Sequence, residues 1–142
     1  MICYFDTSAF LKLVIVTEEG ASEAALLWDG AERVASSVLL YPEGRAALAR
    51  ARRSGRLDDR GLREAKDDFE RLWRGVDVLG VAEDLAARAG TLAEQLGLRG
   101  SDAVHLSSAQ TVADPTLVLV AAGRALIGAA RRIGLGVAEI GP

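Results

Sequence analysis

Ile-Cys-Tyr-Phe-Asp-Thr-Ser-Ala-Phe-Leu-Lys-Leu, residues 2–13, is the stretch that decides the fold. A run of strand-forming residues ends at the carboxylate of Asp6, and the small hydroxyl residues Thr7 and Ser8 then open an amphipathic segment. This pattern predicts a buried strand over residues 2–5 that leads directly into a helix. Because open α/β sheets bind their ligands outside the carboxyl ends of the strands, Asp6 is the first candidate for a functional side chain.

The rest of the chain alternates short strand patterns with longer helical ones. Further strands are expected at residues 34–36, 76–81, 117–121 and 136–140. Helices are expected at residues 8–15, 21–27, 39–53, 57–73, 84–96, 101–110 and 124–133. Pro42 belongs in a first helical turn, so the third of these helices should start just before Glu43 or kink there.

Nothing in this order resembles a tight hairpin, which favours parallel strands joined by helices. The near-continuous apolar strands at 2–5 and 117–121 suit positions covered on both faces of a sheet. The sequence therefore predicts a three-layer α/β/α fold with a mainly parallel central sheet. At 142 residues it should form a single domain over 1–142.

Composition excludes several classes of protein. A net charge of -3 argues against binding nucleic acid by bulk electrostatics, although the overall sign can hide a local basic patch. All lysine and arginine residues except Lys12 and Lys66 are arginine. The single cysteine, Cys3, lies in the first predicted strand and fits a reducing compartment. The N-terminus lacks the basic start of a signal peptide, and no apolar run approaches the roughly 18 residues of a membrane span. We therefore expect a cytoplasmic protein with no membrane segment.

Three carboxylates are expected at one edge of the sheet. Asp6 leaves the first strand, Glu43 lies early in the helix after the second, and Asp102 starts the helix after Gly100. Acids gathered in this way either raise their pKa values or bind a cation. Oxygen ligands with almost no histidine or cysteine favour Mg²⁺ or Mn²⁺ over zinc, and phosphodiester hydrolysis is the chemistry that needs such a site.

Each acid also has a purely structural interpretation. Asp6 and Asp102 are good helix N-caps, and Glu43 complements the dipole of its helix. Taken singly, each structural interpretation is the stronger one. Their joint placement at a single edge favours a functional site.

Three segments carry a resemblance to a known family. Phe-Asp-Thr-Ser-Ala at 5–9, the pair formed by 35–39 and 43–48, and Leu-Arg-Gly-Ser-Asp-Ala-Val-His-Leu at 98–106 resemble the successive motifs of PIN-domain ribonucleases, in particular VapC toxins of bacterial toxin–antitoxin pairs. The resemblance spans essentially the whole chain. It implies a PIN-like fold and a Mg²⁺- or Mn²⁺-dependent endoribonuclease, usually a homodimer, that a VapB-type antitoxin inhibits.

The same resemblance assigns roles to individual residues. Asp6, Glu43 and Asp102 become the metal-binding, catalytic acids, and one or more of them orients the attacking water. Ser8 and Ser36 become hydroxyls that support those acids.

The chain departs from the family pattern after the fourth predicted strand. The family usually carries Thr-x-Asp-x-x-Leu there, whereas residues 121–126 read Ala-Ala-Gly-Arg-Ala-Leu, so Gly123 stands where the fourth acid is expected. Asp114 precedes that strand and should lie at the opposite edge, while Glu139 is a geometrically allowed substitute. We expect a three-acid site with one well-held metal, a second metal held weakly or only with substrate phosphate, and reduced or absent activity.

Alternatives stay open for several features. The chain could be an interaction module that binds antitoxin, RNA or its own copy without catalysis. An aspartate-nucleophile phosphohydrolase using Asp6 fits less well, because such enzymes place a second aspartate where Ser8 stands and need a lysine in the site. His105, one turn after Asp102, either bonds an acid or phosphate or packs under the site.

A cluster of arginines follows Glu43 in the sequence, at Arg45, Arg50, Arg52, Arg53, Arg56, Arg60 and Arg63. It could run along an RNA backbone or receive an acidic antitoxin segment. It could equally be a solvated helix face with Asp58 and Asp59 as partners.

Overall fold

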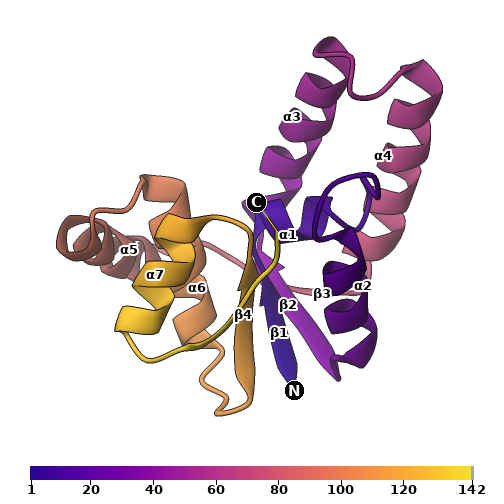
Figure 1. Ribbon diagram of the computed structural model, residues 1–142. Coiled ribbons are helices and arrows are strands. Elements are labelled where there is room, and N and C mark those ends of the chain that lie inside the picture. The colour runs from indigo at the N-terminus through magenta and orange to yellow at the C-terminus, as the bar shows by residue number, and fades with distance from the viewer. Residues whose placement is uncertain (142) are drawn as a thin grey trace.

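The computed structural model describes residues 1–141 (Figure 1). Its strands are β1 (Ile2–Phe5), β2 (Arg33–Ser37), β3 (Val76–Leu79), β4 (Leu117–Ala121) and β5 (Gly136–Glu139). Its helices are α1 (Thr7–Leu11), α2 (Ala21–Gly30), α3 (Leu40–Arg53), α4 (Asp59–Trp73), α5 (Glu83–Leu96), α6 (Gly100–Thr111) and α7 (Arg124–Arg132). The predicted order of elements is confirmed, with ends that differ by a few residues.

The first helix is shorter than the predicted 8–15. It ends at Leu11, after which the amides of Leu13 and Val14 donate to carbonyls three residues earlier. Bonds of this spacing tighten the chain into successive turns. They carry Val14 and Ile15 into the core, where only 7% and 5% of their surface is exposed.

All strand pairings in the sheet are parallel, in the order β3-β2-β1-β4-β5. The chain builds outward from β1 through β2 to β3, then returns to the other side of β1 with β4 and β5. The strand order therefore reverses between β1 and β4, which is the switch point where such sheets bind ligands. Asp6 directly follows β1, so its position in the sequence already places it there.

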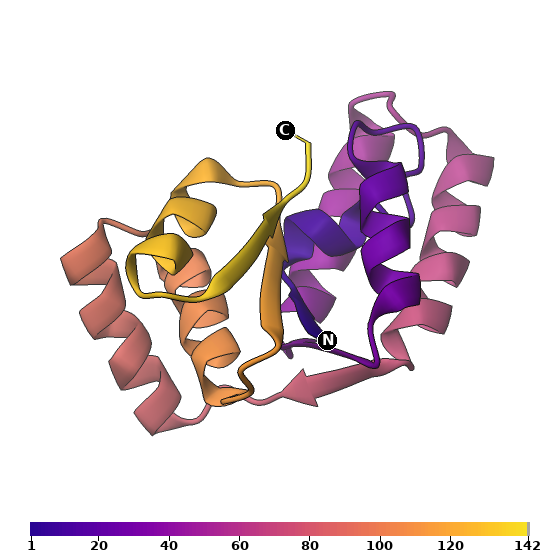
Figure 2. The ribbon, with the colours of Figure 1, turned by 60° about the horizontal axis from the view of Figure 1, so that its bottom comes forward.

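Helices cover both faces of the sheet. Helices α5, α6 and α7 lie on one side, and α1, α2 and α4 lie on the other (Figures 1 and 2). Side chains alternate along β1, so that Cys3 and Phe5 pack into one core cluster and Tyr4 into the other. Burying a large apolar side chain such as Phe5 stabilises the fold by about 1.5–3 kcal/mol. The predicted three-layer α/β/α fold is confirmed.

Helices α3 and α4 form a hairpin that extends beyond the sheet (Figure 1). Helix α3 starts at Leu40, so Pro42 lies in its first turn, as its fixed φ and missing N–H require. Cross-helix ion pairs join Arg45 to Glu70 at 3.0 Å and Arg52 to Asp59 at 2.6 Å. Of the two acids that the solvated-face interpretation named as partners of the arginine cluster, Asp59 pairs with Arg52, whereas Asp58 caps α4 by accepting from the amide of Gly61 at 2.7 Å.

Gly44 sets how closely α3 approaches α4. A Cβ atom at this position would collide with the ring of Phe69, which is fully buried. That ring in turn packs edge-on against Phe10 of α1, with centroids 5.3 Å apart. Because Gly44 directly follows Glu43, this close packing also fixes where the Glu43 backbone stands.

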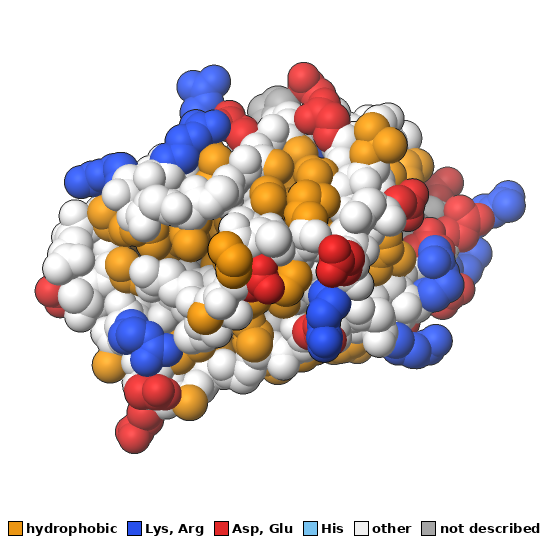
Figure 3. Space-filling view, turned by 90° about the horizontal axis from the view of Figure 1, so that it is seen from below, with side chains coloured by type: hydrophobic (Ala, Val, Ile, Leu, Met, Phe, Trp, Pro, Cys, Tyr) orange, Lys and Arg blue, Asp and Glu red, His pale blue; other side chains and the backbone are white. Residues whose placement is uncertain are grey.

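The face of the molecule where β1 begins carries both acidic and basic side chains around a central group of apolar side chains (Figure 3). Charge on this face is mixed. Among the described helices, none combines the length and apolar character needed to cross a membrane.

Candidate active site

The three acids predicted to gather do line one hollow, of about 350 Å³. The hollow is lined by Asp6, Thr7, Ser8, Leu11, Glu43, Ala47, Arg50, Arg99, Asp102 and His105. These residues come from three segments: the end of β1 with α1, one face of α3, and one face at the start of α6. Spacings of three and four residues along α3 and α6 place the contributing side chains on a single helical face.

Asp6 is both a helix cap and a site residue. Its Oδ1 accepts from the amide of Ala9 at 2.9 Å, which caps α1, and only 6% of its surface is exposed. Burial raises the pKa of Asp6, and the nearby charge of Asp102 raises it further, while the hydrogen bonds from Ala9 and Ser8 and the charge of His105 oppose the rise. A cation in the hollow would relieve both effects that raise this pKa.

The two serines expected to support the acids act at different places. Ser8 Oγ donates to both oxygens of Asp6, at 2.7 and 3.0 Å, and accepts from the amide of Ala122 at 3.1 Å. Ser8 therefore joins Asp6 to the carboxyl end of β4. Ser36 is buried, does not line the hollow, and donates to the carbonyl of Phe5 at 2.6 Å. It holds the strand end beneath Asp6 and leaves the carboxylates to other donors.

Glu43 is held by two donors. Its Oε1 accepts from Thr7 Oγ1 at 2.7 Å and from His105 Nε2 at 2.9 Å. Burial pushes the pKa of Glu43 upward, but these two hydrogen bonds and the charge of His105 together bring it below its ordinary value. Glu43 therefore stays ionised more readily than an ordinary glutamate.

His105 connects Glu43 to the sheet. Only 2% of its surface is exposed, and its Nδ1 lies 2.8 Å from the hydroxyl of Tyr4. Because an ionised carboxylate only accepts, Nε2 donates to Glu43. Burial raises the pKa of Tyr4, so its hydroxyl keeps the proton that it can donate to Nδ1. Of the two interpretations of His105, both are right: it packs under the site and bonds an acid.

Sequence reasoning missed Tyr4 and Thr7. A signal for Tyr4 was present, because residues two apart on a strand face the same side, and Tyr4 lies two residues before Asp6. Thr7 was considered only as a helix cap. Its hydroxyl instead donates to Glu43 on a different helix.

Asp102 is the least constrained acid. It lies in the first turn of α6, whose N-cap is Arg99, so the interpretation of Asp102 as an N-cap is wrong. Within residues 1–141 its carboxylate makes no hydrogen bond or ion pair. Its oxygens are therefore available to a ligand.

The donor set fits a hydrated magnesium or manganese ion. No group of three or more His, Cys, Asp and Glu side chains among the described residues is close enough to enclose a metal by itself. Mg²⁺ does not need such a cage, since it keeps several waters and commonly takes only one or two protein carboxylates. Asp6 and Asp102 supply those hard oxygen donors, while Glu43 is engaged by Thr7 and His105.

Gly123 directly follows Ala122, whose amide donates to Ser8 of the hollow, and it carries no side chain. It is the N-cap of α7, with φ of -78°, and a Cβ there would meet no atom within 4 Å. The first atom of a side chain is therefore accommodated at this position. Asp114, as predicted, lies at the start of β4, where its Oδ1 accepts from the amide and hydroxyl of Thr116 at 2.7 and 2.6 Å.

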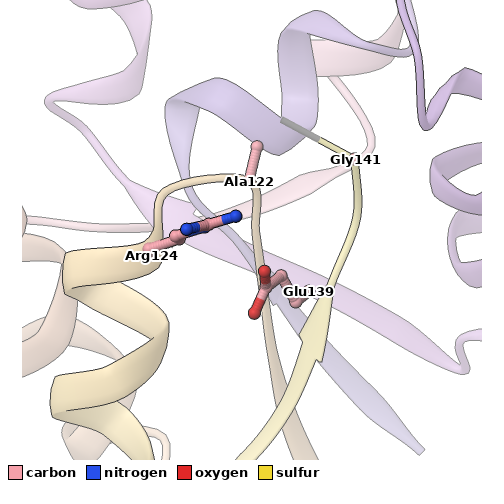
Figure 4. A pocket seen from close by; sticks show the side chains of 4 residues that line it. All are labelled: Ala122, Arg124, Glu139 and Gly141. Atoms are coloured by element: carbon pink, nitrogen blue, oxygen red, sulfur yellow. The ribbon is translucent and has the colours of Figure 1, made fainter.

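Glu139 does not replace the missing acid. It lines a separate pocket of about 580 Å³ together with Ala122, Arg124 and Gly141 (Figure 4). Its carboxylate lies 3.8 Å from Arg131. The pocket that holds Glu139 contains none of the three acids.

Comparison with known proteins places the chain in a family. Residues 3–125 match the PIN domain family. The chain belongs to the PIN domain family. The expected three-layer PIN-like fold is thereby confirmed.

Within that family the chain is similar to VapC ribonucleases. It is 44% identical over 137 residues to Ribonuclease VapC45 of Mycobacterium tuberculosis (strain CDC 1551 / Oshkosh) and equally to Ribonuclease VapC49 of Mycobacterium tuberculosis (strain ATCC 25618 / H37Rv). Each alignment covers 96% of this chain and 94% of the relative. The predicted resemblance to VapC toxins is confirmed.

Solved structures share the fold at lower identity. VapC20 of Mycobacterium tuberculosis, a sarcin-ricin loop cleaving toxin, has a TM-score of 0.70 at 20% identity, covering 89% of this chain and 94% of that one. FitAcB from Neisseria gonorrhoeae has a TM-score of 0.69 at 17% identity, covering 96% of each. VapBC2 from Rickettsia felis, bound to a DNA fragment from its promoter, has a TM-score of 0.65 at 16% identity and covers 99% of each.

Proposed function

We propose that this protein is a metal-dependent endoribonuclease of the VapC type, which hydrolyses phosphodiester bonds in RNA. The observation that carries the proposal is the meeting of Asp6, Glu43 and Asp102 in one hollow beside the switch point of the sheet. The 44% identity to two proteins named as VapC ribonucleases supports it. Because Gly123 replaces the expected fourth acid, activity is lower than that of a four-acid site.

Asp6 and Asp102 would hold a Mg²⁺ or Mn²⁺ ion. When bound, such an ion lowers the pKa of water and neutralises charge that develops on the phosphate. Asp6 is kept in place by Ser8, which donates to both of its oxygens. The raised pKa of Asp6 supports this role, because burial and the charge of Asp102 both penalise its carboxylate until a cation arrives.

Glu43 would orient the attacking water. Thr7 and His105 both donate to Oε1, which leaves Oε2 without a protein partner among residues 1–141. This second oxygen accepts a hydrogen bond from water, and the lowered pKa of Glu43 keeps it ionised for that purpose. Tyr4 and His105 act by holding the carboxylate still.

The biological setting is part of the same proposal. We propose that a VapB-type antitoxin inhibits the enzyme, that the chain folds as one domain over 1–142, and that it acts as a homodimer in the cytoplasm. Its likeness in fold to the Rickettsia felis VapBC2 complex and to a toxin-antitoxin complex from Klebsiella pneumoniae, at TM-scores of 0.65 each, supports the antitoxin.

The test is cleavage of a labelled pool of structured RNA by the antitoxin-free protein in Mn²⁺, Mg²⁺ or EDTA, beside an Asp6→Ala variant. Cuts that need metal and vanish in Asp6→Ala are expected. Cleavage by Gly123→Asp alone would instead indicate a binding module that has lost catalysis. Cleavage that persists in EDTA or in Asp6→Ala would rule out this active site.

A further inference from the structure

Two arginines line the hollow that holds the acids. Arg50 lies on α3, seven residues beyond Glu43 on the same helical face, and Arg99 precedes Asp102 by three residues at the start of α6. At 1.5 Å per residue, Arg50 lies about 10 Å along α3 from Glu43, and Arg99 about 5 Å from Asp102 along α6. Helix α3 extends away from the sheet (Figure 1), and Arg50 is the residue furthest along it that lines the hollow.

The side chains of these two arginines have no partner, unlike several arginines of the cluster that follows Glu43. Arg45 and Arg52 bond to carboxylates of α4, and Arg60 bonds to Glu64 within α4. Neither the Arg50 nor the Arg99 side chain makes a hydrogen bond or ion pair in the part of the chain that the structure describes. Both are exposed, so their guanidinium donors face solvent and remain free for an incoming anion.

Carboxylates and unpaired guanidinium groups in one hollow have complementary tasks. Carboxylate oxygens take up a metal ion, whereas the planar guanidinium fork matches the oxygens of a phosphate. A nucleic acid strand whose scissile phosphate enters the hollow must also carry its neighbouring phosphates past the residues that line it. An acidic protein segment that entered the hollow would be repelled by the charge of the acids. The arrangement therefore favours a nucleic acid strand over such a segment.

We propose that Arg50 and Arg99 bind the phosphates that flank the scissile phosphate of a single-stranded RNA segment, an inference that rests on the proposed ribonuclease function. Unpaired loops are the form of RNA whose backbone can follow such a hollow without the constraint of a duplex. The two arginines thus position the substrate, while the acids carry out the chemistry.

The experiment measures RNA binding apart from cleavage. Arg50→Ala and Arg99→Ala are made in an Asp6→Asn background, and the affinity for a labelled single-stranded 12-nucleotide RNA pool is measured by fluorescence anisotropy in Mg²⁺ between 50 and 200 mM KCl. Arg53→Ala and Arg74→Ala remove the same charge from exposed positions that do not line the hollow and have no ion pair within residues 1–141. They are the matched controls.

Each hollow variant should weaken binding about 3- to 10-fold and lower the slope of log affinity against log salt by about 0.7, the value of one phosphate contact to a single strand. The controls should change affinity less than about 2-fold, and Arg50→Lys should restore the salt slope, since lysine keeps the charge. In the Asp6-containing protein the same two variants should raise KM and leave kcat nearly unchanged, the sign of a binding contact made equally in ground and transition state.

Other results overturn the proposal in distinguishable ways. If the unmodified protein cleaves RNA and the hollow variants bind RNA as well as the controls do, the arginines do not bind substrate. Their role would then be to bind a protein partner. Equal weakening by all four substitutions would show a general charge effect. If the unmodified protein neither cleaves nor binds RNA, the proposed function itself fails.

Discussion

The two sides of the acid hollow are built in different ways. On the Glu43 side, Tyr4, His105 and Thr7 form a chain of hydrogen bonds that holds one carboxylate oxygen from two directions. On the side of β4, Gly123 offers no side chain, and the hydrogen bonds that reach Asp6 and Ser8 involve only the backbone of that strand end: the amide of Asp6 donates to the carbonyl of Val120, and the amide of Ala122 donates to Ser8. The first side is preorganised by the protein alone, whereas the second depends on what binds there.

This difference explains why the acids behave differently. Glu43 has its pKa lowered because donors surround its carboxylate. Asp6 has its pKa raised because burial and Asp102 outweigh its donors. A site of this kind is ready to orient water on one side and ready to receive a cation on the other.

The largest effect should come from Asp6→Asn, which removes the charge but keeps an amide oxygen able to cap α1. We expect cleavage to fall by more than about 100-fold, because substitutions of residues that only support metal ligands already cost about 10- to 100-fold. RNA cleavage rates and Mn²⁺ affinity by calorimetry measure it. Asp67→Asn, at an exposed position outside the hollow, is the control and should cleave normally. Full activity of Asp6→Asn would remove Asp6 from the mechanism.

The next effect tests the preorganised side. His105→Leu leaves the Tyr4 hydroxyl and Glu43 without their shared partner, so we expect cleavage to fall about 10- to 100-fold. It should also lower the free energy of unfolding by about 1–3 kcal/mol, the cost of leaving a buried polar group unpaired. Tyr4→Phe removes only the hydrogen bond between Tyr4 and His105 and should lower the free energy of unfolding by about 1 kcal/mol. Denaturation in urea measures the effect of each variant on stability, and the pH profile of cleavage measures its effect on the site. If Tyr4→Phe cleaves with an unchanged pH profile while His105→Leu does not, the chain of bonds ends at His105.

The two sides should also respond oppositely to pH when metal is absent. Asp6 binds its proton more tightly folded than unfolded, so its ionisation costs stability as pH rises above the ordinary aspartate value of 3.8. Glu43 binds its proton less tightly when folded, so it contributes stability above its ordinary value of 4.5, which is lost as pH falls through its lowered pKa.

Thermal denaturation in EDTA at pH 7 and pH 3 measures this contrast. At pH 7, Asp6→Asn should raise the melting temperature and Glu43→Gln should lower it. Both differences should shrink at pH 3. Shifts of the same sign at pH 7 would show that the two acids share one environment after all.

The smallest effect should come from adding a carboxylate at Gly123, on the side of the hollow next to β4. Gly123→Asp adds a carboxylate at a position where the Cβ meets no atom within 4 Å, and it should raise Mn²⁺ affinity and cleavage several-fold. As an N-cap of α7 it should also add a few tenths of a kcal/mol to the free energy of unfolding. Gly123→Asn supplies the same cap without the charge and is the matched control. No gain in affinity or cleavage from Gly123→Asp would contradict the idea that this side lacks an acid.

Much of the fold could be predicted from the sequence, because its signals are local. Apolar runs, helical spacing and the absence of hairpin turns specify a parallel sheet, and parallel strands deliver their carboxyl ends to one edge. That rule alone brought Asp6, Glu43 and Asp102 together. Errors arose where local signals compete: the helix after Asp6 ends at Leu11 because Val14 and Ile15 turn into the core, and Arg99 takes the N-cap position that Asp102 was expected to fill.

The sequence by itself determined the order of elements, the edge at which the acids meet and the absence of a carboxylate at Gly123. The tertiary structure alone decided which partners those acids have. The bond between Tyr4 and His105 joins residues 101 apart, and the bond between His105 and Glu43 joins residues 62 apart. The tertiary structure also decided that Arg50 and Arg99, among many arginines, line the hollow. Such contacts depend on how closely whole helices pack against the sheet, and no periodic pattern within one segment records that distance.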